Sequence, residues 1–203
     1  MNLETAILEI KKFWNTNEEF SFGKSKNQNH VERLENEFGV AIPDSLKEYI
    51  TNFASLNDFY FTTVGNPICI YGVDNLKFKQ DGYNFNPVKN TKIEDWNESF
   101  FILADEGADP VIIDLSHPEN GIQKLMHGAG SWDYGETIAD SIGQFLLCSA
   151  AIHHALTNFE EESIIDDENG FNLAENAAKW YFKNMKNWAG NYYSEWCSIF
   201  DNH

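Results

Sequence analysis

The spacing of apolar residues changes twice along this chain, and the order of those changes constrains the fold more than any other feature. Up to about residue 53, apolar side chains recur every three or four positions, which is the period of a helix face. From about residue 57 they fall in short aromatic and β-branched runs divided by Gly, Pro and Asn, a pattern typical of strands and turns. Helical spacing returns over residues 136–156 and, after an acidic stretch, again over residues 172–200. We therefore predict an α+β fold, a twisted antiparallel sheet with flanking helices and a helical C-terminal extension.

The predicted helices have recognisable ends. Asn2 is a natural N-cap for the first, and Gly39 suits the left-handed position that ends the second. The third begins at Pro43, because a proline lacks the N–H that would be unpaired in a first turn anyway. The polar stretch 15–29, which carries Phe20, is predicted as a loop. The predicted helices span residues 3–14, 28–38, 43–53, 136–156 and 172–200, the last with a break at Gly190-Asn191.

Five short runs between the helices are predicted to be strands, at residues 59–64, 68–71, 99–104, 110–115 and 121–127. Their connections are short and carry turn residues, among them Gly107 and the pair Asn120-Gly121. Short connections favour antiparallel neighbours, because a parallel crossover needs a dozen residues or more.

The charge of the chain limits its partners. It has 14 Lys and Arg against 32 Asp and Glu, so its formal net charge is −18. A field of that sign repels nucleic acid and anionic membrane surfaces and attracts basic proteins. A high net charge also keeps a protein soluble, but the charge here far exceeds the magnitude of about 2–8 that solubility asks of a small domain.

Three features predict a cytoplasmic protein. No apolar run is long enough to cross a bilayer. The N-terminus lacks the basic head and apolar stretch of a secretory signal. The three cysteines, at 69, 148 and 197, are odd in number and widely spaced, which fits reduced thiols.

Three segments together carry a resemblance to one family. The first is Leu34–Lys47, which reads LENEFGVAIPDSLK, and the second is Phe101–Leu115, which reads FILADEGADPVIIDL. The third runs from His127 through Trp132 to residues 138–146, which read IADSIGQFL. Their order and spacing resemble the SUKH superfamily in its Smi/Knr branch, with Ala108 standing where the family's turn has a glycine.

The resemblance implies a SUKH-like α+β domain over residues 1–156, with a twisted antiparallel sheet and flanking helices. Bacterial members resemble immunity proteins, which bind and silence a cognate polymorphic or contact-dependent toxin. Fungal relatives resemble regulatory scaffolds in cell-wall signalling. The family pattern carries no catalytic residues, so it transfers none to this chain.

Residues 157–203 lie outside the resemblance, and we interpret them as an acidic linker and a helical extension packed on the same domain. The acidic stretch 160–168 ends at the turn pair Asn169-Gly170. The helical part has an apolar seam spaced by three and four residues, namely Ala178, Phe182, Met185, Ala189, Tyr192, Trp196 and Ile199. We expect this seam to pack within the chain, with a partner or dimer surface as the alternative.

The hypothesis for function is stoichiometric binding of a basic toxin domain, and the first alternative is a regulatory scaffold of the Smi/Knr type. Many bacterial toxins are nucleases with basic clefts, and an acidic inhibitor can occupy such a cleft as a nucleic-acid mimic. The candidate contact residues are Asp105, Glu106, Asp133 and Tyr134, which lie at strand ends near aromatic residues. The sequence predicts no metal, nucleotide or other cofactor, and it leaves a monomer and a homodimer both open.

We expect the other conspicuous residues to have structural roles and no direct part in function. Asp109 is expected to cap backbone N–H groups, and Trp132 is expected to be in the core. His153 falls on the apolar stripe of the 136–156 helix, so a satisfied core histidine is expected there. A hydrolase using Cys148 and His153 is kept as an alternative that fails if either residue is fully buried.

Overall fold

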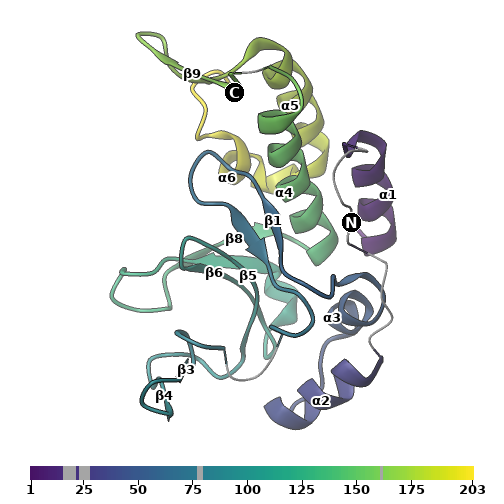
Figure 1. Cartoon of the computed structure of the whole chain (residues 1–203), viewed down its shortest axis with the longest axis vertical. Helices are drawn as coiled ribbons and strands as arrows, with labels where there is room; N and C mark the ends of the chain where they lie inside the picture. Colours follow the sequence, from purple (N-terminus) through teal and green to yellow (C-terminus); the bar gives the residue numbers. More distant parts are fainter. Residues whose placement is uncertain (16–21, 23–27, 77–79, 161) are drawn as a thin grey trace. The chain divides into compact units, whose positions relative to one another are not determined.

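The computed structural model describes residues 1–15, 22, 28–76, 80–160 and 162–203. Most of the predicted loop 15–29, with Phe20, lies outside the described residues. The elements confirm the α+β class, with helices before and after a large antiparallel sheet (Figure 1). The chain forms two compact units, one of Met1–Phe20, Phe61–Ile68 and Ile138–His203, the other of Ser21–Tyr60 and Cys69–Thr137.

Six strands make up the large sheet, in the order β1-β2-β5-β6-β7-β8. Their bounds are β1 (Phe59–Phe61), β2 (Ile68–Ile70), β5 (Phe100–Glu106), β6 (Asp109–Asp114), β7 (Ile122–Leu125) and β8 (Gly135–Ala139). The five predicted strands are confirmed, with shorter bounds at β1, β2 and β7. The pairs β5–β6 and β6–β7 are antiparallel, as their short connections predict. The turn-rich stretch between β2 and β5 also holds a small hairpin, β3 (Phe85–Asn86) with β4 (Thr91–Lys92).

The first unit is built around a helix that is buried on nearly every side. Helix α4 (Ile142–Thr157) is covered by α1 (Leu3–Phe13) and by α5 (Glu175–Trp188), as Figure 1 shows. Every residue from Ile142 to His153 is buried. The Asn2 Oδ1 atom accepts a hydrogen bond from the Thr5 N–H at 2.8 Å, which confirms the predicted N-cap of α1.

The prediction that a helix begins at residue 136 is wrong. Residues 135–139 form strand β8, and α4 begins at Ile142. The Ser141 Oγ atom caps α4 by accepting the Gln144 N–H at 3.2 Å, and the Gln144 Oε1 atom accepts the Asp140 N–H at 2.7 Å. A serine followed three residues later by glutamine is the usual signature of a helix start, and it marks the boundary in the sequence as well.

The acidic stretch leads into an ordered hairpin. Strand β9 (Ile164–Asp167) pairs with β10 (Gly170–Leu173), and the predicted turn at Asn169-Gly170 joins them. The chain end then covers the outer side of β10, because the Asp201 N–H donates to the Phe171 oxygen at 2.9 Å. The predicted helical tail is confirmed as α5, a 3₁₀ turn at Gly190–Tyr192 and α6 (Tyr193–Cys197).

The second unit begins with two short helices. Helix α2 (Gln28–Phe38) ends at Gly39, whose φ of 68° is the left-handed conformation predicted for it. Helix α3 (Asp44–Glu48) continues as a π-helical turn at Tyr49–Phe53. Pro43 is the N-cap of α3, one position earlier than a proline in the first turn.

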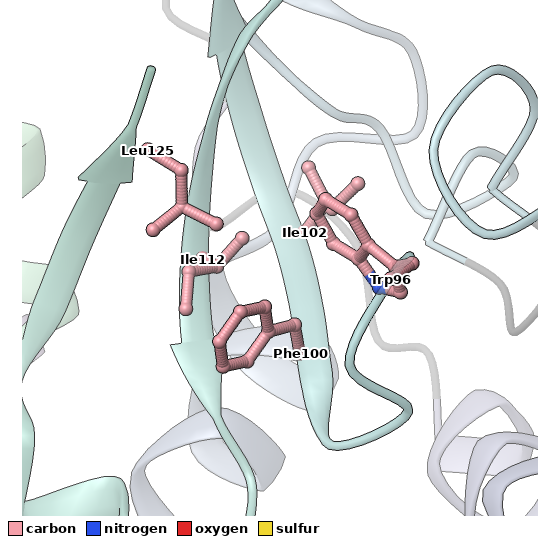
Figure 2. Packing of buried hydrophobic residues seen from close by; sticks show 5 residues of the cluster. All are labelled: Trp96, Phe100, Ile102, Ile112 and Leu125. Atoms are coloured by element: carbon pink, nitrogen blue, oxygen red, sulfur yellow. The ribbon is translucent and has the colours of Figure 1, made fainter. Parts of the chain in front are cut away.

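Apolar side chains of this unit gather over the middle of the sheet. Figure 2 shows five buried members of this core cluster, contributed by β5, β6, β7 and the loop before β5. They are Trp96, Phe100, Ile102, Ile112 and Leu125. Three partly buried aromatic residues pack against this cluster, namely Tyr71, Tyr83 and Trp132. Trp132, which the sequence predicts to be a core residue, therefore lies at the edge of the core.

The turn between β5 and β6 contains backbone strain that a glycine would remove. Gly107 and Ala108 have φ values of 61° and 77°, and two successive positive φ values define the tight hairpin turn that favours glycine. An alanine in that region costs about 1–2 kcal/mol, of which about 0.4–1 kcal/mol is returned by the smaller entropy of its unfolded chain. Ala108→Gly is therefore expected to raise the free energy of unfolding by about 0.5–1 kcal/mol, measured by urea denaturation.

Ala129→Gly is the matched control for this prediction. Ala129 is also exposed and in a turn, but its φ is not positive. Glycine there is expected to lower the free energy of unfolding by about 0.4–1 kcal/mol. Equal effects of the two glycines would contradict the strain at Ala108.

Candidate functional site

A pocket of about 300 Å³ opens in the second unit beside strands β1, β2 and β5. These three strands are neighbours in the sheet, although β5 follows β2 only after a long connection. The lining combines carboxylates, tyrosines and amides, namely Asp58, Tyr60, Cys69, Tyr71, Asn75, Gln80, Asp81, Tyr83 and Asp105. Of the lining residues that the structure describes, none is Lys, Arg or His.

Tyr71 and Asp105 are brought together by the pairing of the chain beyond β2 with β5. The Tyr71 N–H donates to the Leu103 oxygen at 2.9 Å, which places Tyr71 near the end of β5. From there the Tyr71 hydroxyl donates to Asp105 Oδ2 at 2.7 Å. A diagonal neighbour two residues along the partner strand is within reach of a long side chain, so this contact follows from the register.

Asp58 fixes the opposite side of the pocket. Its Oδ1 atom accepts the Gly72 N–H at 2.8 Å, and both of its oxygens accept from Asn75 Nδ2, at 2.9 and 2.8 Å. These bonds tie the residue before β1 to the loop after β2. These hydrogen bonds hold the carboxylate in one orientation.

Gln80 forms a third side of the pocket, and its side-chain amide bonds to the backbone of β5 as a neighbouring strand would. Its Nε2 donates to the Ile102 oxygen at 2.9 Å, and its Oε1 accepts the Ile102 N–H at 3.2 Å. The buried side-chain amide therefore satisfies both backbone groups of a β5 residue. This contact positions the following residues, of which Tyr83 packs on Trp96 and Trp132 with ring centroids 5.5 and 5.9 Å apart.

The carboxylates alone carry the negative charge of the pocket, because its phenols and its thiol are neutral. Burial, and then the hydrogen bond to Asp105, raise the pKa of Tyr71 far above its usual value. Burial, followed by the charge of Asp105, raises the pKa of Tyr83 to about 12. Burial also raises the pKa of the Cys69 thiol. At neutral pH the phenols and the thiol are uncharged, so the carboxylates set the sign of the pocket.

The structure places one of the four candidate contact residues in this pocket and the others elsewhere. Asp105 lines the pocket. Glu106, the last residue of β5, forms an ion pair with Lys124 Nζ at 2.6 Å. Asp133 is exposed and accepts from the Ser131 Oγ atom at 2.8 Å, and Tyr134 is 61% exposed.

Asp109 takes the structural role predicted for it. Its Oδ1 atom accepts the His127 N–H at 2.8 Å and lies 2.6 Å from His127 Nδ1. The capped group is therefore His127, two residues after the end of β7, and does not belong to the turn that precedes Asp109. Neither residue lines the pocket.

Cys148 and His153 do not form a nucleophilic site. Cys148 is 0% exposed, and burial raises the pKa of its thiol well above the usual value, the opposite of what an activated nucleophile needs. His153 is also buried, its Nδ1 accepts the Thr62 N–H at 3.0 Å, and its ring stacks on Trp14. Because Cys148 is fully buried, the hydrolase alternative fails, and His153 is the satisfied core histidine that the sequence predicts.

The described residues contain neither a cluster of metal ligands nor a helix that could cross a bilayer. Among the described residues, no group of three or more His, Cys, Asp or Glu side chains is placed to hold a metal ion. In the part of the chain that the structure describes, no helix has both the length and the apolar character needed to cross a bilayer. All three cysteines are free and buried.

Sequence reasoning missed most of the pocket. Asp58 and Tyr71 flank the first two strands closely, which is the same position at a strand end that singled out Asp105. That signal was available for both residues. Tyr83 and Gln80 lie in the irregular stretch between β2 and β5, where no periodicity points to a shared site.

Part of the chain matches the model of a known protein family. The family model described as SMI1 / KNR4 family (SUKH-1) matches residues 27–148. The matched range includes every residue that lines the pocket. The comparison with curated proteins gave no match.

Proposed function

This chain belongs to the SMI1 / KNR4 family (SUKH-1), and on that premise we propose that it is a non-enzymatic immunity protein. It binds a basic toxin domain one to one in the cytoplasm and blocks that domain's active site or substrate cleft. A nuclease domain is the toxin class that best fits, because its cleft is built to bind a polyanion. The observation that carries this proposal is the acidic, tyrosine-lined pocket on a chain of net charge −18.

The pocket has the properties of an anchor site for a protein partner. It lies at the ends of sheet strands, so its side chains are held by a rigid element. Tyrosine is enriched among the residues that dominate binding energy, and Tyr60 at the rim is 57% exposed. The net charge adds long-range attraction, which speeds the encounter with a basic partner.

The experiment is a rescue test with the toxin domain encoded beside this gene. Cells expressing that domain are expected to survive only when this protein is also present, and the two proteins are expected to co-purify one to one. The matched variant is Asp166→Asn, which removes one exposed negative charge that does not line the pocket and is expected to keep rescue. If this protein neither rescues the cells nor binds the toxin domain, and instead captures several unrelated partners, the immunity proposal is wrong and a regulatory scaffold role is favoured.

The salt dependence of the complex tests the electrostatic part separately. We expect the association rate constant to fall by about 10-fold between 50 and 500 mM NaCl, because the Debye length falls from about 14 to about 4 Å over that range. Stopped-flow fluorescence measures this rate directly. An unchanged rate would show that the charge of −18 does not steer the encounter.

A further inference from the structure

We propose that the pocket beside β1, β2 and β5 is a receptacle for one arginine side chain of the bound partner. The pocket is small, about 300 Å³, and is lined by carboxylates, phenols and amides. Its size suits one side chain or one small molecule, at the lower end of the range for ligand pockets. The identity of the partner rests on the proposed function above, whereas the chemistry of the ligand rests on the pocket.

One oxygen of the Asp105 carboxylate accepts a hydrogen bond within the pocket, and the carboxylate can accept a further one from a ligand. Its Oδ2 atom accepts the hydrogen bond from Tyr71. Among the residues that the structure describes, no donor is recorded for its Oδ1 atom. A carboxylate oxygen has room for about two acceptor interactions, so Asp105 keeps capacity for an N–H donor from outside.

The aromatic side of the pocket suits a flat cation. Three tyrosines, at 60, 71 and 83, line the pocket. Guanidinium is planar, weakly hydrated and stacks on aromatic rings, and it offers five N–H donors in a fixed fork. An ammonium group is compact and strongly hydrated, so it loses more on entering a pocket built from phenols.

The alternative of a metal ion fits the same residues poorly. Asp58 is already hydrogen-bonded through both oxygens, and Asp105 through one. Among the described residues, no group of His, Cys, Asp and Glu side chains is placed to hold a metal. Hydrogen-bonded carboxylates beside phenols are suited to an organic cation with several donors.

The pocket is held in shape before any ligand enters. Tyr71 and Tyr83 pack against the core cluster, whose five buried members are drawn in Figure 2. This packing restricts the two tyrosine rings. The bonds of Asp58 to Gly72 and Asn75 fix the other side. A prepared site loses little entropy on binding, which is the property of an anchor position in an interface.

The test titrates three soluble probes into the full chain at low salt. Binding is measured from the chemical-shift changes of the Tyr71, Gly72 and Asp105 amides in NMR spectra. The probes are N-acetyl-L-arginine amide, its lysine counterpart and the neutral citrulline counterpart. We expect the arginine probe to bind with a millimolar Kd, the lysine probe at least about 3-fold more weakly and the citrulline probe at least about 10-fold more weakly. Equal shifts with arginine and citrulline, no pocket shift with arginine, or tighter binding of lysine would overturn the proposal.

Asp105→Asn and Asp166→Asn form the matched pair of variants. Asparagine at 105 still accepts from Tyr71 but loses the charge, so the Kd for the arginine probe is expected to rise by about 10-fold or more. Asp166→Asn removes the same charge at an exposed residue that does not line the pocket and is expected to change the Kd by less than about 2-fold. Thermal unfolding of both variants shows that they fold, and equal losses in the two would contradict a specific pocket.

The same variants separate this inference from the proposed function. If the toxin complex forms and the arginine probe leaves the pocket resonances unchanged, the arginine receptacle is wrong and immunity stands. If the probe binds as expected but no toxin rescue is seen, immunity is wrong and the cation pocket stands. If both hold, Asp105→Asn is expected to weaken the toxin complex by about 10-fold or more.

Discussion

Gly72→Ala is expected to lower the free energy of unfolding by about 3 kcal/mol or more. A Cβ atom at residue 72 would lie 2.3 Å from the carbonyl carbon of Asn57 and 2.5 Å from the Leu56 oxygen. Both are backbone atoms, so no side-chain rotation can relieve the clash, and the segment before β1 has to move away from the loop after β2. Urea denaturation followed by tryptophan fluorescence measures the loss.

Gly65→Ala is the control for this prediction. A Cβ at Gly65 meets no atom within 4 Å, and its φ is not positive. Alanine there is expected to change the free energy of unfolding by about 0.5 kcal/mol or less, or to raise it slightly by restricting the unfolded chain. Equal stability of the two variants would show that the close approach at Gly72 does not exist in solution.

The effect at Gly72 also reaches the pocket. The Gly72 N–H holds Asp58 Oδ1 at 2.8 Å, so movement of the segment before β1 displaces this carboxylate. Any Gly72→Ala protein that remains folded is therefore expected to bind the arginine probe more weakly than the wild type. Gly65→Ala is expected to bind it unchanged.

The elements of this fold could be predicted from local patterns, whereas the pocket could not. Helix caps, turn glycines and apolar spacing are properties of short segments, so α1, α2 and the strands from β5 to β7 could be placed from the sequence. The pocket depends on which strands become neighbours. Asp58 and Asp105 meet the same cavity because β2 lies beside β5, and no local pattern records that adjacency.

The error at β8 has a different physical cause. Ile138 and Ile142 are four residues apart, so they fit one helix face, although Ile138 belongs to a strand and Ile142 opens a helix. Apolar spacing alone cannot separate the two cases when both residues are buried. The cap at Ser141 decides the boundary, because its hydroxyl satisfies a backbone N–H that the first turn leaves free.

The C-terminal seam shows the same limit within a correctly predicted helical region. Trp196 and Ile199 both fit its spacing, but Trp196 is 8% exposed and Ile199 is 51% exposed. Trp196 Nε1 donates to the Ile138 oxygen at 2.8 Å, and its ring centroid lies 6.2 Å from that of Phe145 on α4. Trp196 therefore packs on Ile138 and Phe145, whereas Ile199 is exposed at the surface.

Trp196→Ala is expected to lower the free energy of unfolding by about 3–5 kcal/mol, the usual cost of removing a large buried aromatic side chain. Two losses combine, since the cavity beside Phe145 stays unfilled and the Ile138 oxygen loses its donor. Trp196→Phe retains most of the packing and is expected to cost about 1–2 kcal/mol, close to the price of the lost hydrogen bond.

Ile199→Ala completes this series as the exposed member of the same seam. It is expected to cost about 0.5 kcal/mol or less, because its side chain buries little area. Urea denaturation of the three variants gives the ranking Trp196→Ala, then Trp196→Phe, then Ile199→Ala. A cost for Ile199→Ala as large as that for Trp196→Ala would mean that the whole seam is covered in solution, and a second copy of the chain would then have to be sought by sedimentation.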